Sequence, residues 1–194
     1  LSTAGSILLY GGTGGIHARD KGVRYGSRSG SGVTSSSADL TMRGDVLVFD
    51  SLASTFEHLV TAAGDVVMES HGSSFASPFN YQNVDLDGTV TSLRVGKTTN
   101  TANVAMTSPA SIAGPITVYG GDLDINAALM ANGSTITLDG DGMVEDGGSG
   151  FVTATSLALL DGTVSMDHSS NNVDVLAGSN LDSLNYLDSA EIEI

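Results

Sequence analysis

The 194 residues are enough to form one hydrophobic core, and a hydrophobic content of 40% excludes disorder of the whole chain. A formal net charge of −15 makes binding to nucleic acid or to an anionic membrane surface unfavourable. No apolar run approaches the roughly 20 residues of a membrane helix, so membrane insertion is not expected. Glycine contributes 25 residues while Lys and Glu are scarce, and this composition predicts an all-β protein with many tight turns.

Acidic residues dominate the second half of the chain. Residues 1–97 hold all seven Lys and Arg residues together with nine acidic residues, whereas residues 98–194 hold thirteen acidic residues and no Lys or Arg. Divalent cations are therefore natural counter-ions for the second half. Cysteine is absent, so stability must come from repetitive burial rather than from disulfides.

Residues 1–37 differ from the rest of the chain in composition. They hold most of the Gly and Ser clusters and four of the seven basic residues. We interpret this segment as irregular first coils of the fold, and a flexible linker is the alternative.

Residues 38–194 carry a regular repeat. Gly44-Asp45-Val46 recurs as Gly64-Asp65-Val66, and the same step separates Ile116 from Ile136. Nearly equal steps also separate Leu123, Val144, Val164 and Leu184. A period of about 20 residues, with two or three short strands in each unit, predicts a solenoid of β-helix repeats.

Alternating segments indicate which side chains face inward. In Asp122-Leu123-Asp124-Ile125-Asn126 the apolar pair points to one side of a strand and the polar residues point to the other. The same pattern occurs at 135–139, 163–167 and 173–175. One coil cannot bury its own apolar face, so inward side chains are expected to stack on their equivalents in the next coil.

A loop excursion from the solenoid is expected near residues 73–82. This segment contains Pro78 and three aromatic residues, and it lacks the alternation found elsewhere. We expect the loop to leave the stack and to pack back over it.

The phrases of residues 95–194 resemble those of a known family. They include Ser-Ile-Ala-Gly-Pro-Ile-Thr-Val-Tyr-Gly-Gly at 111–121, Asp-Leu-Asp-Ile-Asn-Ala-Ala-Leu at 122–129, Leu-Ala-Leu-Leu at 157–160, Val-Ser-Met-Asp-His-Ser-Ser-Asn-Asn-Val at 164–173 and Ser-Leu-Asn-Tyr-Leu-Asp at 183–188. This half of the chain resembles the large secreted bacterial adhesins related to filamentous haemagglutinin, which are exported by two-partner secretion or as autotransporter passengers; residues 38–94 resemble them loosely. The resemblance implies a right-handed parallel β-helix with coils of about 20 residues, and export across the outer membrane.

The resemblance also implies adhesion or aggregation, and the family offers no catalytic residue to carry over. We therefore expect a non-catalytic structural and adhesive segment of a secreted surface filament. Its expected partners are neighbouring segments of the same long chain, further copies, or a receptor on a host or cell surface. The chain begins at Leu1 without Met and ends in the strand-like Ala190-Glu191-Ile192-Glu193-Ile194, so we interpret it as an internal fragment.

Two other classes of function stay open at this point. A polysaccharide-acting β-helix enzyme is the first, although such enzymes usually grip sugars with aromatic and basic residues, and residues 98–194 have neither Trp nor a Lys or Arg side chain. A self-assembling extracellular fibre or surface-layer protein is the second. Clustered carboxylates in an aromatic-lined groove would favour the enzyme.

Arg43-Gly44-Asp45 is a candidate receptor-binding tripeptide, because the same three residues are used by integrin ligands. That recognition needs a protruding loop which presents Arg and Asp in opposite directions. Here Asp45 leads directly into a strand-like segment, and Gly-Asp-Val recurs at 64–66 without Arg. We therefore favour a structural turn over a receptor site.

Asp139, Asp141, Glu145 and Asp146 form a candidate calcium site among turn-forming glycines. Calcium binds six to eight oxygen atoms from carboxylates and carbonyls, and Asp-x-Asp-Gly turns supply both. The established calcium-binding repeats are not present, so a solvated acidic turn is the alternative. No other cofactor is expected.

Overall fold

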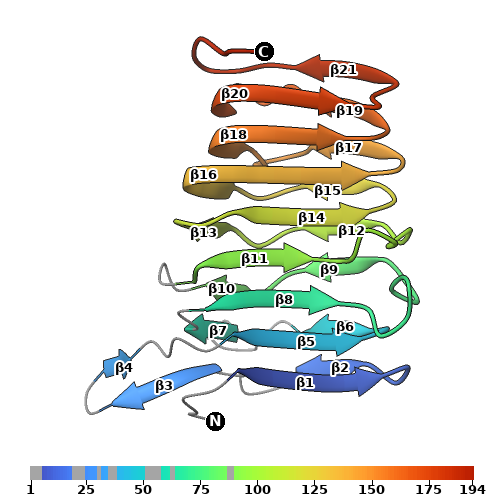
Figure 1. The fold of residues 1–194 in the computed structure, drawn as a ribbon, viewed down its shortest axis with the longest axis vertical. Coiled ribbons are helices and arrows are strands. Elements are labelled where there is room, and N and C mark those ends of the chain that lie inside the picture. The colour runs from blue at the N-terminus through green and yellow to red at the C-terminus, as the bar shows by residue number, and fades with distance from the viewer. Residues whose placement is uncertain are drawn as a thin grey trace.

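The computed structural model describes residues 6–18, 25–29, 32–34, 39–50, 58–61, 64–86 and 90–194. Every element among them is a β-strand, and the strands form rungs that stack from the amino-terminal to the carboxyl-terminal end (Figure 1). The chain runs to the right along the front of the stack and returns behind it while it climbs, so the coil is right-handed. The predicted right-handed parallel β-helix is confirmed. The described residues include no helix long and apolar enough to cross a bilayer.

One long parallel sheet runs the length of the stack. Its strands, in spatial order, are β1 (Ile7–Gly12), β5 (Leu40–Gly44), β8 (Asp65–Glu69), β11 (Ser92–Val95), β14 (Ile116–Gly120), β16 (Leu129–Gly140), β18 (Val152–Leu160) and β20 (Asn172–Ser179). Spatial order follows chain order throughout, as a solenoid requires.

Two further faces complete the coil. The second sheet consists of β9 (Phe79–Tyr81), β12 (Val104–Met106), β15 (Leu123–Ile125), β17 (Met143–Asp146), β19 (Thr163–Met166) and β21 (Ser183–Tyr186). The third face includes β13 (Ala110–Ile112), which pairs with the first residues of β16. Because β16, β18 and β20 each bend at a corner, their first halves belong to the third face and their second halves to the long sheet.

The amino-terminal rungs are less regular. β2 (Ile16–Ala18) pairs with β6 (Leu47–Phe49), and β10 (Val84–Leu86), β7 (His58–Thr61), β3 (Tyr25–Ser29) and β4 (Gly32–Thr34) form a four-stranded sheet. β3 and β4 pair antiparallel, unlike the other strand pairs that the structure describes. Since β1 and β2 stack in parallel on β5 and β6, residues 7–18 form a rung of the solenoid. The other residues of the segment 1–37 lie largely outside the described part of the chain.

Coil length differs between the two halves. In the long sheet Leu40 pairs with Val66, and Val66 pairs with Leu93. These partners are farther apart in sequence than Ile116 and Ile136, which pair in the second half. The predicted period of about 20 residues is confirmed in the second half, and the coils of the first half are longer.

The longer coils overturn one predicted register. The two Gly-Asp-Val segments do not occupy equivalent positions in successive coils, because Val66 lies beside Leu40 rather than Val46. The Val46 carbonyl instead accepts a hydrogen bond of 2.7 Å from the backbone nitrogen of Ile16 in the preceding coil.

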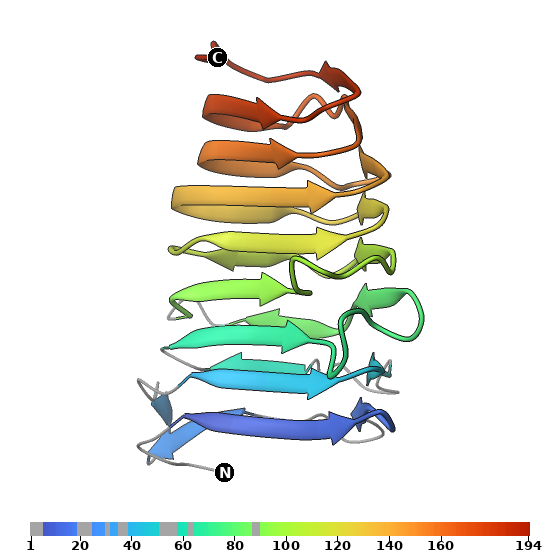
Figure 2. The ribbon, with the colours of Figure 1, turned by 45° about the vertical axis from the view of Figure 1, so that its right-hand side comes forward.

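An irregular loop lengthens one of these coils, the one that runs from Val66 to Leu93. It covers residues 70–78, between β8 and β9, and stands off the side of the stack (Figure 2). We expected this excursion near 73–82. It begins earlier and ends at Pro78, because residues 79–81 form β9 and pair with β12.

Inward side chains form apolar columns along the stack. The column on the long sheet contains seven buried residues, each of which pairs with the next: Leu40, Val66, Leu93, Ile116, Ile136, Leu157 and Leu176. On the second sheet, Leu123, Val144, Val164 and Leu184 form another column, as predicted. The first three are buried and Leu184 is 46% exposed. Each rung thus covers the apolar face of its neighbour.

The predicted alternation is wrong at one position. Val173 is buried but Val175 is only partly buried. The chain turns a corner between them, and Leu176 takes the inward position beside Leu157. Alternation with a period of two fails wherever a strand bends from one face to the next.

Candidate functional site

An ion-pair cluster lies on the outer face of the long sheet. Glu69 in β8 accepts hydrogen bonds from Arg43 in β5 and from Arg94 in β11, the latter at 2.8 Å between Nη2 and Oε2. The Glu69 carboxylate is almost covered by the two guanidinium groups, whose own side chains are 41% and 36% exposed. Burial alone raises the pKa of Glu69, but the hydrogen bonds and charges of Arg94 and Arg43 outweigh it and hold the pKa below its usual value.

The candidate tripeptide Arg43-Gly44-Asp45 is part of this region. Arg43 lies on β5 and is paired with Glu69. Asp45 Oδ1 accepts a hydrogen bond of 2.7 Å from the backbone nitrogen of Gly72 in the loop. Both charged groups therefore have partners within the chain. Receptor binding by the tripeptide stays a prediction.

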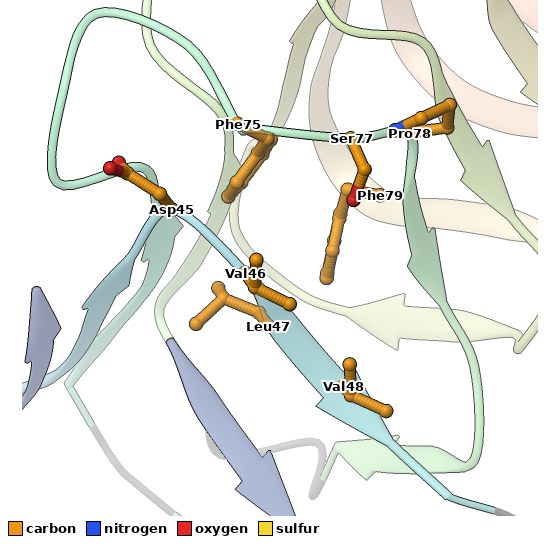
Figure 3. Close-up of a pocket in the computed structure, with 8 residues that line it drawn as sticks. All are labelled: Asp45, Val46, Leu47, Val48, Phe75, Ser77, Pro78 and Phe79. Atoms are coloured by element: carbon orange, nitrogen blue, oxygen red, sulfur yellow. The ribbon is translucent and has the colours of Figure 1, made fainter. Parts of the chain in front are cut away.

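The loop 70–78 encloses a small hollow against β6. Its volume is about 50 Å³, and its lining consists of Asp45, Val46, Leu47, Val48, Phe75, Ser77, Pro78 and Phe79 (Figure 3). Phe75 and Phe79 point from the loop side toward β6, and their rings stack with centroids 4.9 Å apart. Because a water molecule occupies about 30 Å³ of liquid, the hollow has room for water but not for a substrate.

Polar contacts fix this loop to the next coil. The buried Asn100 accepts hydrogen bonds from Ser74 Oγ at 2.9 Å and from the Phe75 backbone nitrogen at 3.1 Å. Lys97 Nζ donates to the Gly72 carbonyl at 2.9 Å. The loop is therefore anchored to the coil that follows it.

Three carboxylates meet at the corner after the long sheet. Oxygen atoms of Asp139, Asp141 and Asp161 lie within 4.8 Å of one another. Burial, followed by the negative charges of Asp161 and Asp141, raises the pKa of Asp139. Hard cations prefer such oxygen ligands, and calcium binding here stays a prediction. The structure brings together two of the four residues predicted for this site and adds Asp161.

The other two predicted ligands lie elsewhere. Glu145 is exposed on β17. Asp146 turns toward the following corner, where it accepts hydrogen bonds from the backbone nitrogens of Asp167 and His168 at 2.9 and 3.1 Å. It also accepts one from Asn171 Nδ2 at 2.7 Å. Asp146 thus stabilises the turn at residues 167–171.

Asp161 was missed by sequence reasoning, although a signal for it exists. It precedes Gly162 in the coil that follows Asp141-Gly142. Placing the Asp-Gly pairs of successive coils beside one another would have brought Asp161 next to Asp141.

A shallow polar depression of about 260 Å³ lies at the corner between the third face and the long sheet. It is lined by Ala131, Asn132, Gly133, Thr153, Ala154, Thr155, Asn172 and Asp174. Residues 132–134 bulge from β16 here, because Ala131 pairs with Ala154 whereas Thr135 pairs with Ser156. The bulge lies beside the depression that is also lined by Thr155 and Asp174, the single corner residues of β18 and β20.

Two histidines in the described part of the chain hold surface segments together. His71 Nδ1 lies 2.8 Å from the Tyr10 hydroxyl, and the two rings meet edge to face. His168 stacks on Phe151 and accepts a hydrogen bond from the Ser170 backbone nitrogen at 3.1 Å.

No known protein family, curated protein or solved structure matches this chain.

Proposed function

We propose that this chain is a non-catalytic, structural and adhesive segment of a secreted bacterial surface filament, acting as part of its body. The observation that carries the proposal is the continuous parallel stack of the long sheet from β1 to β20. The resemblance of residues 95–194 to large secreted adhesins supplies the adhesive and extracellular part. The proposal places the chain outside the cell, on the outer surface or in a filament.

The stack suits a filament body because each coil makes the same contacts as the one before it. Backbone hydrogen bonds run along the stack, and apolar columns such as Leu93, Ile116 and Ile136 run through its centre. Solenoid stability is a sum of rung stabilities and nearest-neighbour contacts. Adding rungs lengthens such a body without changing its cross-section.

The two hollows found among the described residues offer little enclosed space for a small substrate. Ligand pockets usually measure about 300–1,000 Å³ and bury most of the ligand. The two hollows described above measure about 50 and 260 Å³, and the larger one is a shallow polar depression. Contacts with large partners along an exposed face fit this surface better than chemistry in a cleft.

Adhesion can be tested with beads that carry the folded chain. Beads coated with the folded chain should attach to host-cell monolayers under flow more often than beads coated with the same chain after denaturation by heat. Equal attachment of the two would overturn the adhesive part of the proposal. Aggregation of the beads with one another and no attachment to cells would favour a self-assembling fibre. Release of reducing ends from polysaccharides would favour an enzyme.

A further inference from the structure

We propose that Asn132, at the bulge of β16, is a site of spontaneous deamidation through a succinimide formed with Gly133. Asn132 is the sole asparagine in the sequence that is followed by glycine. A side chain on the next residue hinders the approach of its backbone nitrogen to the asparagine amide, and glycine has none. The proposal stands on the chemistry of this pair and is independent of the proposed function.

The structure leaves the Asn132–Gly133 pair free of the strand ladder. Ala131 pairs with Ile112 and Ala154, and the ladder resumes toward β18 only at Thr135. Residues 132–134 therefore have no register partner on either neighbouring strand. A backbone nitrogen inside a ladder is held by its hydrogen bond and by its neighbours, and this constraint is absent at the bulge.

The surroundings of the pair are open. Asn132 and Gly133 are both exposed, and the amide of Asn132 has one long contact, 3.4 Å from Nδ2 to Ser111 Oγ. Gly133 has a φ of +79°, and a Cβ atom built on it would meet nothing within 4 Å. Water and hydroxide can therefore reach both reacting groups.

The reaction needs no oxidant and no cofactor. The Gly133 backbone nitrogen loses its proton to base and bonds to Cγ of Asn132, and the bond from Cγ to Nδ2 breaks with release of ammonia. Water then adds to either carbonyl of the cyclic imide and opens the ring to aspartate or isoaspartate. The net change is one water consumed, one ammonia released and one carboxylate gained.

The fold is expected to survive this modification. The bulge contributes no ladder pair, so the extra methylene of an isoaspartate backbone breaks no register in the stack. The new carboxylate enters the depression that Asp174 also lines, in a half of the chain that has no Lys or Arg. The product is a folded chain with a more negative corner.

Asn172 is an internal control in the same depression. It is exposed like Asn132, but it pairs with Thr153 in the ladder and is followed by the buried Val173. The proposal predicts conversion of Asn132 and retention of Asn172 in one molecule.

The test is peptide mapping by mass spectrometry after incubation of the folded chain at neutral and mildly alkaline pH. The peptide with Asn132 should gain one mass unit, partly as isoaspartate and faster at higher pH, while the peptide with Asn172 stays unchanged. Gly133→Ala should slow the conversion several-fold, and Asn132→Gln should abolish it, which provides a second variant if the first folds poorly.

A chain unfolded in urea supplies the reference rate for this test. It should convert at a rate of the same order as the folded chain, because the bulge imposes little constraint on Gly133. Conversion in urea with none in the folded chain would overturn the proposal, as would equal conversion at Asn172.

Discussion

Ile116 of β14 and Ile136 of β16 lie directly opposite each other on adjacent parallel strands, and neither exposes any surface. They are consecutive members of the apolar column that runs from β5 to β20. A polar group at either position would face apolar side chains on the rungs above and below it. The regular repeat of the second half depends on this stacking.

Replacing Ile136 with Asn should therefore lower the free energy of unfolding by about 4 kcal/mol or more, because it removes apolar contacts and buries an unpaired amide. Thr137→Asn is the matched control, since Thr137 is the next residue along β16 and is only partly buried. It should change the free energy by about 0.5 kcal/mol or less. Urea unfolding followed by circular dichroism measures both. Similar losses for the two variants would contradict the inward assignment of Ile136.

Glu69→Gln should destabilise the protein at neutral pH by about 1–3 kcal/mol, because it leaves Arg43 and Arg94 without their shared carboxylate. The loss is smaller than for a fully buried pair, since both arginines reach solvent.

This difference should depend on pH. The folded-state pKa of Glu69 lies below the ordinary value of 4.5, so its stabilising contribution is present above pH 4.5 and is lost as pH falls through the folded-state pKa. The gap in Tm between the wild-type chain and Glu69→Gln should narrow as the pH falls below 4.5. A gap that stays constant down to acid unfolding would show that the carboxylate charge is not involved.

Asp139→Asn should have the opposite effect to Glu69→Gln and should stabilise the protein at neutral pH by about 0.5–1 kcal/mol, because it removes a charge that is partly buried and that Asp161 and Asp141 repel. The raised folded-state pKa means that the contribution of Asp139 to stability is most favourable below the ordinary value of 3.8 and becomes less favourable as pH rises through the folded-state pKa. The advantage of the variant should therefore grow over that range. Thermal scans in buffer with EDTA measure it, and Asp85→Asn serves as an exposed control. No gain at neutral pH would contradict the repulsion.

Alanine substitutions at Gly162 and Gly148 can separate the effect of backbone conformation on stability from the effect of close packing. Both have a positive φ, +69° and +62°, but a Cβ atom on Gly162 would lie 2.1 Å from the Gly142 carbonyl oxygen, whereas one on Gly148 would meet nothing within 4 Å. Gly148→Ala should cost about 1 kcal/mol, from conformation alone. Gly162→Ala should cost clearly more, because the clash is with backbone of the preceding coil. Equal losses in urea unfolding would contradict this packing.

The sequence was sufficient to predict the fold and the second-half register, because one period and one alternation pattern describe those coils. It was insufficient in the first half, where the coil from Leu40 to Val66 is longer than those of the second half and the loop 70–78 lengthens the next coil, from Val66 to Leu93. It also failed at the acidic corner. Asp161 joins Asp139 only because of the coil length between them, and Asp146 is drawn away by the amide of Asn171. Contacts between coils depend on residue counts that local patterns do not fix.

The most direct test of the proposed function is immunogold electron microscopy of intact producing cells with an antibody against the folded chain. The proposal predicts gold particles on projections that extend from the outer surface, and loss of this label when intact cells are treated with protease. Label confined to the interior of sectioned cells, and unaffected by protease outside, would contradict a role in a surface filament.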